Sequence, residues 1–277
     1  MSCKNLHVAI MAGGLGKQMN SDLPKVLQAV NNVPMIILVI RTALTLNPVK
    51  IWIIIEKYSM VSQVVGEYFT SEQLKLFTYV NQESPLGTGD AVRQILPYAQ
   101  SLSDSTPVLI LSGDVPLIQT ATLNQLLGNK PVQPSLLCTL LKNPTGNGRL
   151  ILDTNERDSQ SGCLKDNNFD SVGLKGKVIS IIEEKDCTSE QKSIQLINCG
   201  TYVFPLGLLR TYLPRISNHN QSKEYYLTDL IHLISQNNGP SVIPIEVPVN
   251  LQYTLHNVNT VADLNYILFA QQAGYFD

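Results

Sequence analysis

The segment VAIMAGGLGKQMNSDLPKVL, residues 8–27, joins an apolar run to a glycine-rich turn. A short apolar run that ends in glycines is typical of a buried strand followed by a turn. In open α/β sheets, ligands bind beyond the carboxyl ends of the strands, which is where this turn would lie. The segment therefore predicts a first strand at residues 7–12 and a binding loop directly after it.

The following residues alternate between short apolar runs and helical patterns. Further strands are predicted at residues 50–56, 75–81, 107–114 and 135–141, with helices at 34–44, 59–69 and 88–99. Nearly continuous apolar strands joined by helices indicate a parallel sheet that is covered on both faces. We therefore predict an α/β fold whose doubly wound, mostly parallel sheet is Rossmann-like.

The pattern changes after residue 141. The next expected strands follow one another without full crossover helices, at residues 148–153, 178–184 and 195–204. Such succession indicates a mixed or antiparallel extension of the sheet. A polar, turn-rich segment near 154–177 is expected to form a long exposed loop. The remaining predicted elements are a helix at 225–236, a strand at 241–247 and a helix from about 261 to 270.

Composition narrows the class of protein. Hydrophobic residues make up 44% of the 277 residues and charged residues 15%, which favours a well-buried core. The formal net charge of −2 and the absence of a dense basic cluster argue against nucleic-acid or anionic-membrane partners. No apolar run reaches the roughly 20 residues of a membrane helix. Five cysteines without C-x-x-C spacing suit a reducing compartment, so we expect a cytoplasmic protein.

The glycine loop matches neither of two common phosphate-binding motifs. A Walker A loop requires glycine where Met11 stands and Ser or Thr where Gln18 stands. A dinucleotide-binding fingerprint requires a third glycine where Met19 stands. Lys25 follows the loop closely in the sequence LPKVL and is a candidate phosphate ligand.

Other polar residues follow the predicted strands at the same edge of the sheet. Asp114 leaves an apolar strand through a glycine, a setting that suits a ligand of Mg²⁺. Gln82 precedes a second glycine turn, and its amide can both donate and accept, as a pyrimidine edge requires. Gly148, Glu183 and Lys185 offer polar groups that could hold a sugar.

Nine motifs occur in an order that resembles one family over about residues 5–270. They are AGGLGKQM, LPKVL, Q…LGTGDAV, LSGDVPLI, NPTGNGR, IIEEKD, INCGTYVF, EYYLTDLI and NVNTVADL. The chain resembles the nucleotidyltransferase domain of the bacterial bifunctional N-acetylglucosamine-1-phosphate uridylyltransferases. The resemblance implies a fold of the nucleotide-diphospho-sugar transferase type. It implies transfer of UMP from UTP to an N-acetylhexosamine 1-phosphate, with Mg²⁺ as cofactor.

The resemblance also implies roles for particular residues. The expected nucleotide ligands are Met11, Ala12, Gly13, Gly14, Gln82, Gly87, Thr88, Ser112 and Gly113. Lys25 would neutralise phosphate charge, and Asp114 and Asn259 would hold Mg²⁺. The N-acetylhexosamine would lie on Gly148, Glu183 and Asn198, while Tyr226 and Thr228 would shape that pocket less directly.

The expected domain organisation is a single nucleotidyltransferase domain, residues 1–277. Within it, residues 5–141 would bind the nucleotide and residues 142–259 the sugar, with a loop insertion near 154–177. That loop could cover the sugar, mediate subunit contact or have no fixed structure. The chain carries no hexapeptide repeats of the family's β-helix acetyltransferase domain, so we expect a stand-alone uridylyltransferase; homo-oligomerisation stays open.

The glycine loop departs from the family pattern at two positions. Gln18 replaces an arginine that would grip the transferring phosphates, and Lys17 stands where Thr or Ser is usual. We hypothesise that Lys17 partly replaces the arginine; the alternative is a solvent-facing Lys17 beside an impaired site. Two other functions therefore stay open: a catalytically weak UDP-sugar-binding homologue, and a nucleotidyltransferase for another sugar, such as glucose or N-acetylgalactosamine, or another base.

The compensation hypothesis predicts the effect of two substitutions. Lys17→Ala should lower turnover on the order of 100-fold or more, because one charged group near the transferring phosphates is lost. Gln18→Arg should raise turnover only slightly if Lys17 already supplies the charge. Initial rates of pyrophosphate release measure both effects. A harmless Lys17→Ala together with a strongly activating Gln18→Arg would contradict the hypothesis.

Overall fold

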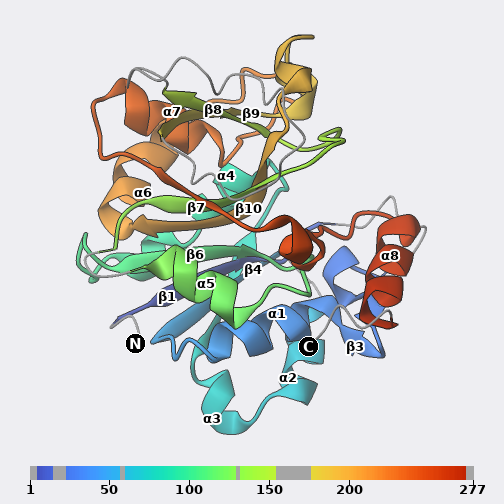
Figure 1. The fold of residues 1–277 in the computed structure, drawn as a ribbon. Helices are drawn as coiled ribbons and strands as arrows, with labels where there is room; N and C mark the ends of the chain where they lie inside the picture. Colours follow the sequence, from blue (N-terminus) through green and yellow to red (C-terminus); the bar gives the residue numbers. More distant parts are fainter. Residues whose placement is uncertain (1–4, 15–22, 57–59, 129–131, 154–175, 273–277) are drawn as a thin grey trace.

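The computed structural model of the chain describes residues 5–14, 23–56, 60–128, 132–153 and 176–272 (Figure 1). The predictions for Lys17 and Gln18 and for nearly all of the 154–177 loop lie outside these residues. Within the described residues, the structure contains no helix whose length and hydrophobicity would suffice to cross a lipid bilayer.

A mostly parallel sheet forms the centre of the molecule (Figure 1). Its strands lie in the order β11-β7-β10-β6-β1-β4-β5. In chain order they are β1 (His7–Met11), β4 (Lys50–Glu56), β5 (Phe77–Gln82), β6 (Pro107–Ser112), β7 (Ser135–Leu140), β10 (Leu196–Pro205) and β11 (Ile243–Glu246). β10 runs antiparallel to both of its neighbours, β6 and β7, whereas β1, β4, β5 and β6 pair in parallel. The predicted α/β fold class is confirmed.

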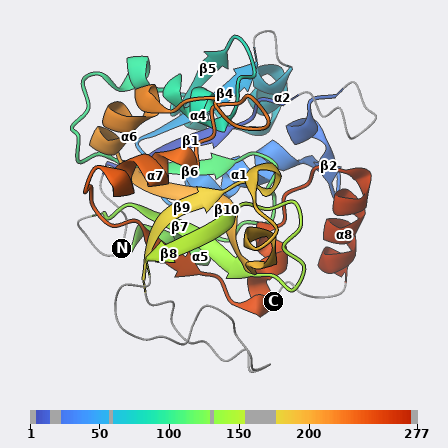
Figure 2. The same ribbon diagram turned by 90° about the horizontal axis from the view of Figure 1, so that it is seen from above.

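The predicted extension of the sheet is a two-stranded antiparallel ribbon. It consists of β8 (Arg149–Asp153) and β9 (Lys177–Ile182), and β8 also pairs with β10 through Arg149 and Ile197. The helix α7 (Asp229–Gln236) packs beside β9 in both ribbon views (Figures 1 and 2). The ribbon therefore brings Gly148, directly before β8, next to Glu183, directly after β9.

Two hydrophobic cores lie on the two faces of the sheet. Strand β4 contributes to both cores, because its side chains alternate between the two faces. One core contains Ile51, Ile53 and Ile55. The other core contains Trp52 and Ile54. A strand that is apolar on both sides must be covered on both sides. The helices of the first core are α1 (Met35–Leu44), α2 (Val61–Tyr68) and α5 (Thr120–Leu127); those of the second are α4 (Thr88–Arg93), α6 (Leu206–Tyr212) and α7 (Asp229–Gln236).

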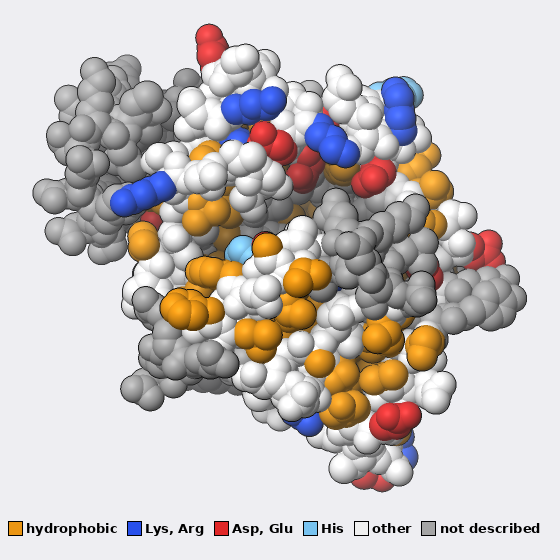
Figure 3. All heavy atoms as spheres, turned by 90° about the vertical axis from the view of Figure 1, so that its right-hand side faces the viewer, with side chains coloured by type: hydrophobic (Ala, Val, Ile, Leu, Met, Phe, Trp, Pro, Cys, Tyr) orange, Lys and Arg blue, Asp and Glu red, His pale blue; other side chains and the backbone are white. Residues whose placement is uncertain are grey.

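The last helix, α8 (Val261–Gln272), lies apart from these layers (Figure 1). It packs through Ile267 and Ala270 into a third apolar cluster, which also contains Val30. Two other side chains of α8 lie outside this cluster: Tyr266 is 47% exposed and Phe269 is 66% exposed. Hydrophobic side chains are visible on the side of the molecule where α8 lies (Figure 3). The cluster attaches α8 beside residues 29–30.

The structure adds some elements that the sequence pattern did not indicate. A hairpin joins β2 (Ala29–Val30) to β3 (Val33–Pro34), and its two central residues, Asn31 and Asn32, have φ values of 48° and 64°. Asparagine tolerates this left-handed conformation, which such two-residue turns require. The structure also contains a short helix α3 (Ser71–Leu74). The helix predicted at 88–99 is divided into α4 and a 3₁₀ turn, Leu96–Ala99, that contains a proline at its start.

Candidate active site

The glycine loop begins where β1 is held between its two parallel neighbours. The backbone N–H of Gly113 donates to the carbonyl of Met11 at 2.9 Å, and that of Ala12 donates to the carbonyl of Ile54 at 2.8 Å. The N–H of Gly14 donates to Oε1 of Glu56 at 3.1 Å. These hydrogen bonds fix the start of the loop at the carboxyl edge of the sheet.

A cluster of charged and amide side chains lies beside the loop. The ammonium group of Lys25 forms an ion pair with Oδ2 of Asp114 and donates to Oδ1 of Asn259 at 2.8 Å. Ser112 donates to Oδ1 of Asp114 at 2.6 Å, and Asn257 donates to the same oxygen at 3.3 Å. The carboxylate side chain is only 8% exposed. The predicted phosphate ligand and both predicted metal ligands therefore converge on one point.

Asn259 is held in place by the start of α8. Asp263 accepts hydrogen bonds from the backbone N–H groups of Asn259 at 3.0 Å and Thr260 at 2.8 Å. Thr260 in turn accepts from the N–H of Asp263, which completes a capping box. The N–H of Val258 donates to the carbonyl of Asp114. Sequence reasoning missed Asp263, although the spacing T-x-x-D in NVNTVADL is a capping signal.

Gln82, the predicted base-reading residue, is almost completely buried at the end of β5. Its side-chain nitrogen donates to the carbonyl of Gly87 at 3.2 Å and to Oδ2 of Asp90 at 2.8 Å. Arg93 forms an ion pair with the other oxygen of Asp90. The expectation that the amide both donates to and accepts from a ligand therefore needs correction, because both N–H groups are already used.

A stretch of chain connects the turn beside Gln82 with the surroundings of Glu183. The N–H of Tyr225 donates to the carbonyl of Leu86 at 2.8 Å, and the N–H of Gly89 donates to the carbonyl of Tyr225 at 2.7 Å. The N–H of Leu227 donates to the hydroxyl of Thr88 at 3.0 Å. We call residues 225–227 the crossing segment. The helix predicted at 225–236 begins only at Asp229, because the crossing segment is paired with the 86–89 turn.

The predicted sugar ligands lie near Thr228, which directly follows the crossing segment. The hydroxyl of Thr228 donates to Oε1 of Glu183 at 2.9 Å. A β-carbon placed on Gly148 would lie 3.4 Å from both carboxylate oxygens of Glu183 and 2.9 Å from Ile181. The N–H of Asn198 donates to the carbonyl of Gly148 at 2.9 Å. The fold thus brings together Gly148, Glu183 and Asn198. Burial of the Glu183 carboxyl group raises its pKa.

Asn198 is partly engaged within the protein. Its side-chain nitrogen donates to the hydroxyl of Tyr202 at 2.6 Å, and its side-chain oxygen accepts from the N–H of Gly200 at 3.1 Å. An asparagine amide has further bonding capacity on both atoms. Asn198 is therefore oriented by the protein and still able to bind a ligand hydroxyl.

A buried arginine fixes the turn that carries Gly148. The side chain of Arg149 is 1% exposed and donates to the carbonyl of Asn147 and to Oε2 of Glu184, the latter at 2.6 Å. Glu184 accepts from the N–H of Gly146 at 3.2 Å, and the hydrogen bond from Arg149 lowers the pKa of Glu184. Sequence reasoning missed Arg149, which ties the NPTGNGR turn to the residues after Glu183.

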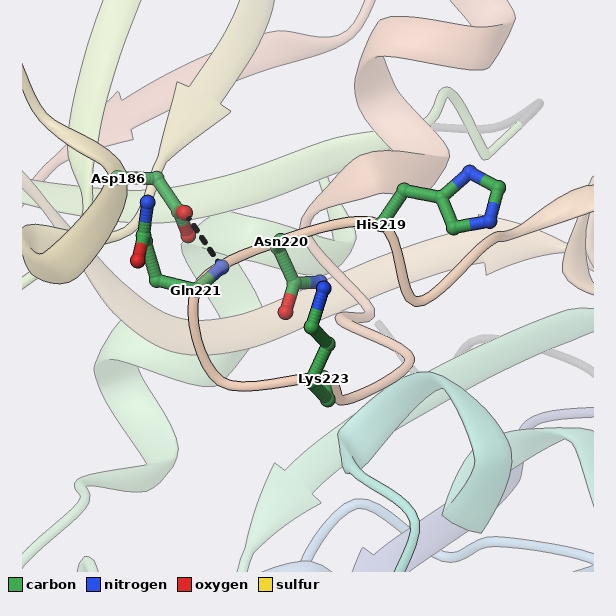
Figure 4. A pocket seen from close by; sticks show the side chains of 5 residues that line it. All are labelled: Asp186, His219, Asn220, Gln221 and Lys223. Atoms are coloured by element: carbon green, nitrogen blue, oxygen red, sulfur yellow. Dashed lines mark hydrogen bonds between the residues drawn. The ribbon is translucent and has the colours of Figure 1, made fainter.

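Lys185, considered as a sugar ligand, is exposed and donates to the hydroxyl of Ser222 at 3.2 Å. Nearby lies a solvent-open hollow lined by Asp186, His219, Asn220, Gln221 and Lys223 (Figure 4). The carboxylate of Asp186 accepts a hydrogen bond from the N–H of Gln221 at 2.9 Å. The hollow therefore lies between the turn that follows Glu183 and the segment 219–223.

The crossing segment predicts a strict requirement for glycine at position 87. Gly87 has φ of 118° and ψ of 172°, and a β-carbon there would lie 2.6 Å from the carbonyl oxygen of Tyr225. Gly87→Ala should lower the free energy of unfolding by on the order of 2 kcal/mol or more. Gly66→Ala, at a helical glycine with nothing within 4 Å, is the control and should be neutral or slightly stabilising. Equal urea midpoints for the two variants would contradict the argument.

The raised pKa of Glu183 predicts a pH-dependent stability difference. A carboxyl group with a raised pKa in the folded state binds protons more tightly there, so the wild type loses stability as pH rises through that range. Glu183→Gln, which keeps an acceptor for Thr228, should be more stable than the wild type at pH 8. The difference should shrink towards pH 4. Urea unfolding measures it, and a difference that grows on acidification would refute the assignment.

Known proteins resemble this chain along much of its length. Residues 8–142 match the model of the MobA-like NTP transferase domain. The chain is 38% identical over 266 residues to a protein of Acanthamoeba polyphaga mimivirus named "Probable UDP-N-acetylglucosamine pyrophosphorylase", covering 95% of this chain and 94% of that protein. It is 39% identical over 225 residues to the bifunctional protein GlmU of Xanthomonas oryzae pv. oryzae, covering 81% of this chain but 43% of GlmU.

The fold also has counterparts among solved structures. A UDP-glucose pyrophosphorylase complexed with UDP-glucose superposes with a TM-score of 0.69 at 14% identity, covering 96% of this chain and 98% of that one. At this identity the likeness shows the fold alone. The resemblance inferred from the nine motifs is confirmed by the sequence relatives. Because identity to the mimivirus protein extends along nearly the whole of both chains, the chain belongs to the UDP-N-acetylglucosamine pyrophosphorylase family of nucleotidyltransferases.

Proposed function

We propose that the protein transfers UMP from UTP to N-acetylglucosamine 1-phosphate, which yields UDP-N-acetylglucosamine and pyrophosphate. The observation that carries the proposal is the convergence of Lys25, Asp114 and Asn259 at the edge of the sheet. The names of the mimivirus and bacterial relatives favour uridylyl transfer and this sugar.

The proposal divides the domain between two substrates. Residues 5–141 would bind UTP, since the glycine loop and Gln82 belong to them. Residues 142–259 would bind the sugar phosphate, since Gly148, Glu183 and Asn198 belong to them. The crossing segment lies between the two groups, which suits a reaction that joins two bound substrates.

The reaction requires no covalent intermediate with the protein. A phosphate oxygen of the sugar 1-phosphate attacks the α-phosphorus of UTP, and the bond from that phosphorus to the bridging oxygen breaks as pyrophosphate leaves. Catalysis of this kind rests on positioning and on neutralisation of charge. Lys25 would bring a positive charge to the phosphates, and the glycine loop would offer backbone N–H groups.

The side chains near Lys25 fit a magnesium ion. Asp114 and Asn259 present oxygens that already converge on one cation, the ammonium group of Lys25. Carboxylate and amide oxygens are hard ligands, and Mg²⁺ in nucleotide enzymes commonly takes one or two protein oxygens together with phosphates. When bound, Mg²⁺ would stabilise negative charge on the reacting phosphates. Asp114 is oriented for this by the hydroxyl of Ser112.

One experiment separates the candidate functions. The protein is incubated with Mg²⁺, each of the four ribonucleoside triphosphates and a panel of sugar 1-phosphates, and pyrophosphate is measured. We expect release with UTP and N-acetylglucosamine 1-phosphate. Release with another pair would indicate a different nucleotidyltransferase. No release with any pair, together with tight UDP-sugar binding, would indicate the binding homologue and overturn the proposal.

The proposed role of Asp114 predicts a large loss of activity on substitution. Asp114→Asn should lower kcat about 100- to 1000-fold, because a charged ligand at the reacting phosphates is lost. Its affinity for Mn²⁺ in the presence of UTP, measured by electron paramagnetic resonance, should fall as well. Asp104→Asn is the matched control, since Asp104 is an exposed ion-pair partner of Arg210. Full activity of Asp114→Asn would exclude the proposed role.

A further inference from the structure

The orientation of the Gln82 amide is determined by its neighbours. Both hydrogens of its nitrogen are used, one towards the carbonyl of Gly87 and one towards Oδ2 of Asp90. Gln82 and Asp90 are each 4% exposed, so water does not compete at this contact. An amide has two donor hydrogens on nitrogen and accepts through its oxygen. Only the acceptor oxygen of Gln82 is therefore left for a ligand.

The opposite orientation of the amide is strongly disfavoured. Turning it over would place its oxygen against the carbonyl of Gly87 and the carboxylate of Asp90, neither of which can donate. Asp90 is held in its position by the ion pair with Arg93 and by the side-chain amide of Gln94, at 3.3 Å from its Oδ1. Arg93 in turn lies over the ring of Tyr225, 5.2 Å from its centroid. Asp90 thus acts as a fixed acceptor.

Within the described residues, the hydrogen bonds of the Gln82 side chain involve its nitrogen, and its oxygen lies near Gly13. It lies 3.5 Å from the point where a β-carbon on Gly13 would stand. We propose that Asp90 is a specificity-determining residue, because it holds Gln82 as an obligate acceptor and so favours nucleobases that present a ring N–H. This inference rests on the proposed function in taking the ligand of the loop to be a nucleotide.

The chemistry of the two pyrimidines explains the selectivity. Uracil carries a hydrogen on N3 and can donate it to the oxygen of Gln82. Cytosine has a lone pair at N3, so two acceptors would face each other there. A glutamine that was free to turn over could accept from uracil or donate to cytosine. The fixed amide removes that freedom, and the buried pair therefore discriminates more than Gln82 alone could.

Asp90→Asn tests the proposal. Asparagine can offer either a donor or an acceptor to Gln82, so the amide regains the freedom to turn over. The ratio of UTP to CTP affinity, measured by calorimetry with Mg²⁺ present, should fall about tenfold, which corresponds to one hydrogen bond. Most of the change should come from tighter binding of CTP. The matched control is Glu72→Gln, which neutralises an exposed ion pair of the same i,i+3 spacing, and its ratio should equal that of the wild type.

A second measurement uses the wild type and does not depend on the folding of a variant. The two side-chain amide protons of Gln82 should exchange with solvent much more slowly than those of the exposed Gln100, as followed by NMR. An unchanged ratio in folded Asp90→Asn, or equal exchange of the two glutamines, would overturn the inference. Intact UTP preference without pyrophosphate release would overturn the proposed function and leave the inference standing. Binding of neither nucleotide by the wild type would overturn both.

Discussion

The parallel pairing of β1 with both β4 and β6 is the constraint on which the site depends. Because these strands run in one direction, their carboxyl ends meet at one edge of the sheet. The ladder continues beyond the strands, through the N–H of Gly113 and the carbonyl of Met11. Asp114 therefore emerges beside the glycine loop. Apolar side chains on both faces of β4 hold this alignment, since slippage by one residue would exchange the two cores.

Much of this could be predicted from the sequence, because the relevant signals are local. Apolar runs marked the strands, and Asp114 and Gln82 could be proposed since each follows such a run. Asp90 and Arg149 could not be found in this way. Their importance comes from partners that the fold supplies: the amide of Gln82 for Asp90, and Glu184, 35 residues away, for Arg149. A buried charge is recognised by its contacts, and those are known only once the chain is folded.

The residue at which helix α7 begins also depends on contacts that only the fold supplies. The apolar spacing in YYLTDLIHLISQ favours a helix from residue 225. In the structure the α-helix begins only at Asp229, because the 86–89 turn offers backbone partners to Tyr225 and a hydroxyl to Leu227. Tertiary hydrogen bonds thus outweigh local preference. The outcome places Thr228 against Glu183, at the start of the following helix.

The pairing of Lys25 with Asp114 and Asn259 also bears on how the protein folds. The carboxylate of Asp114 already has a cation, a hydroxyl and an amide as partners, all supplied by the chain itself. Domains whose ligand sets have no such internal partner unfold when their metal is removed. In this protein, folding does not require a divalent ion at Asp114. Removal of divalent ions should therefore leave the melting temperature of the protein almost unchanged.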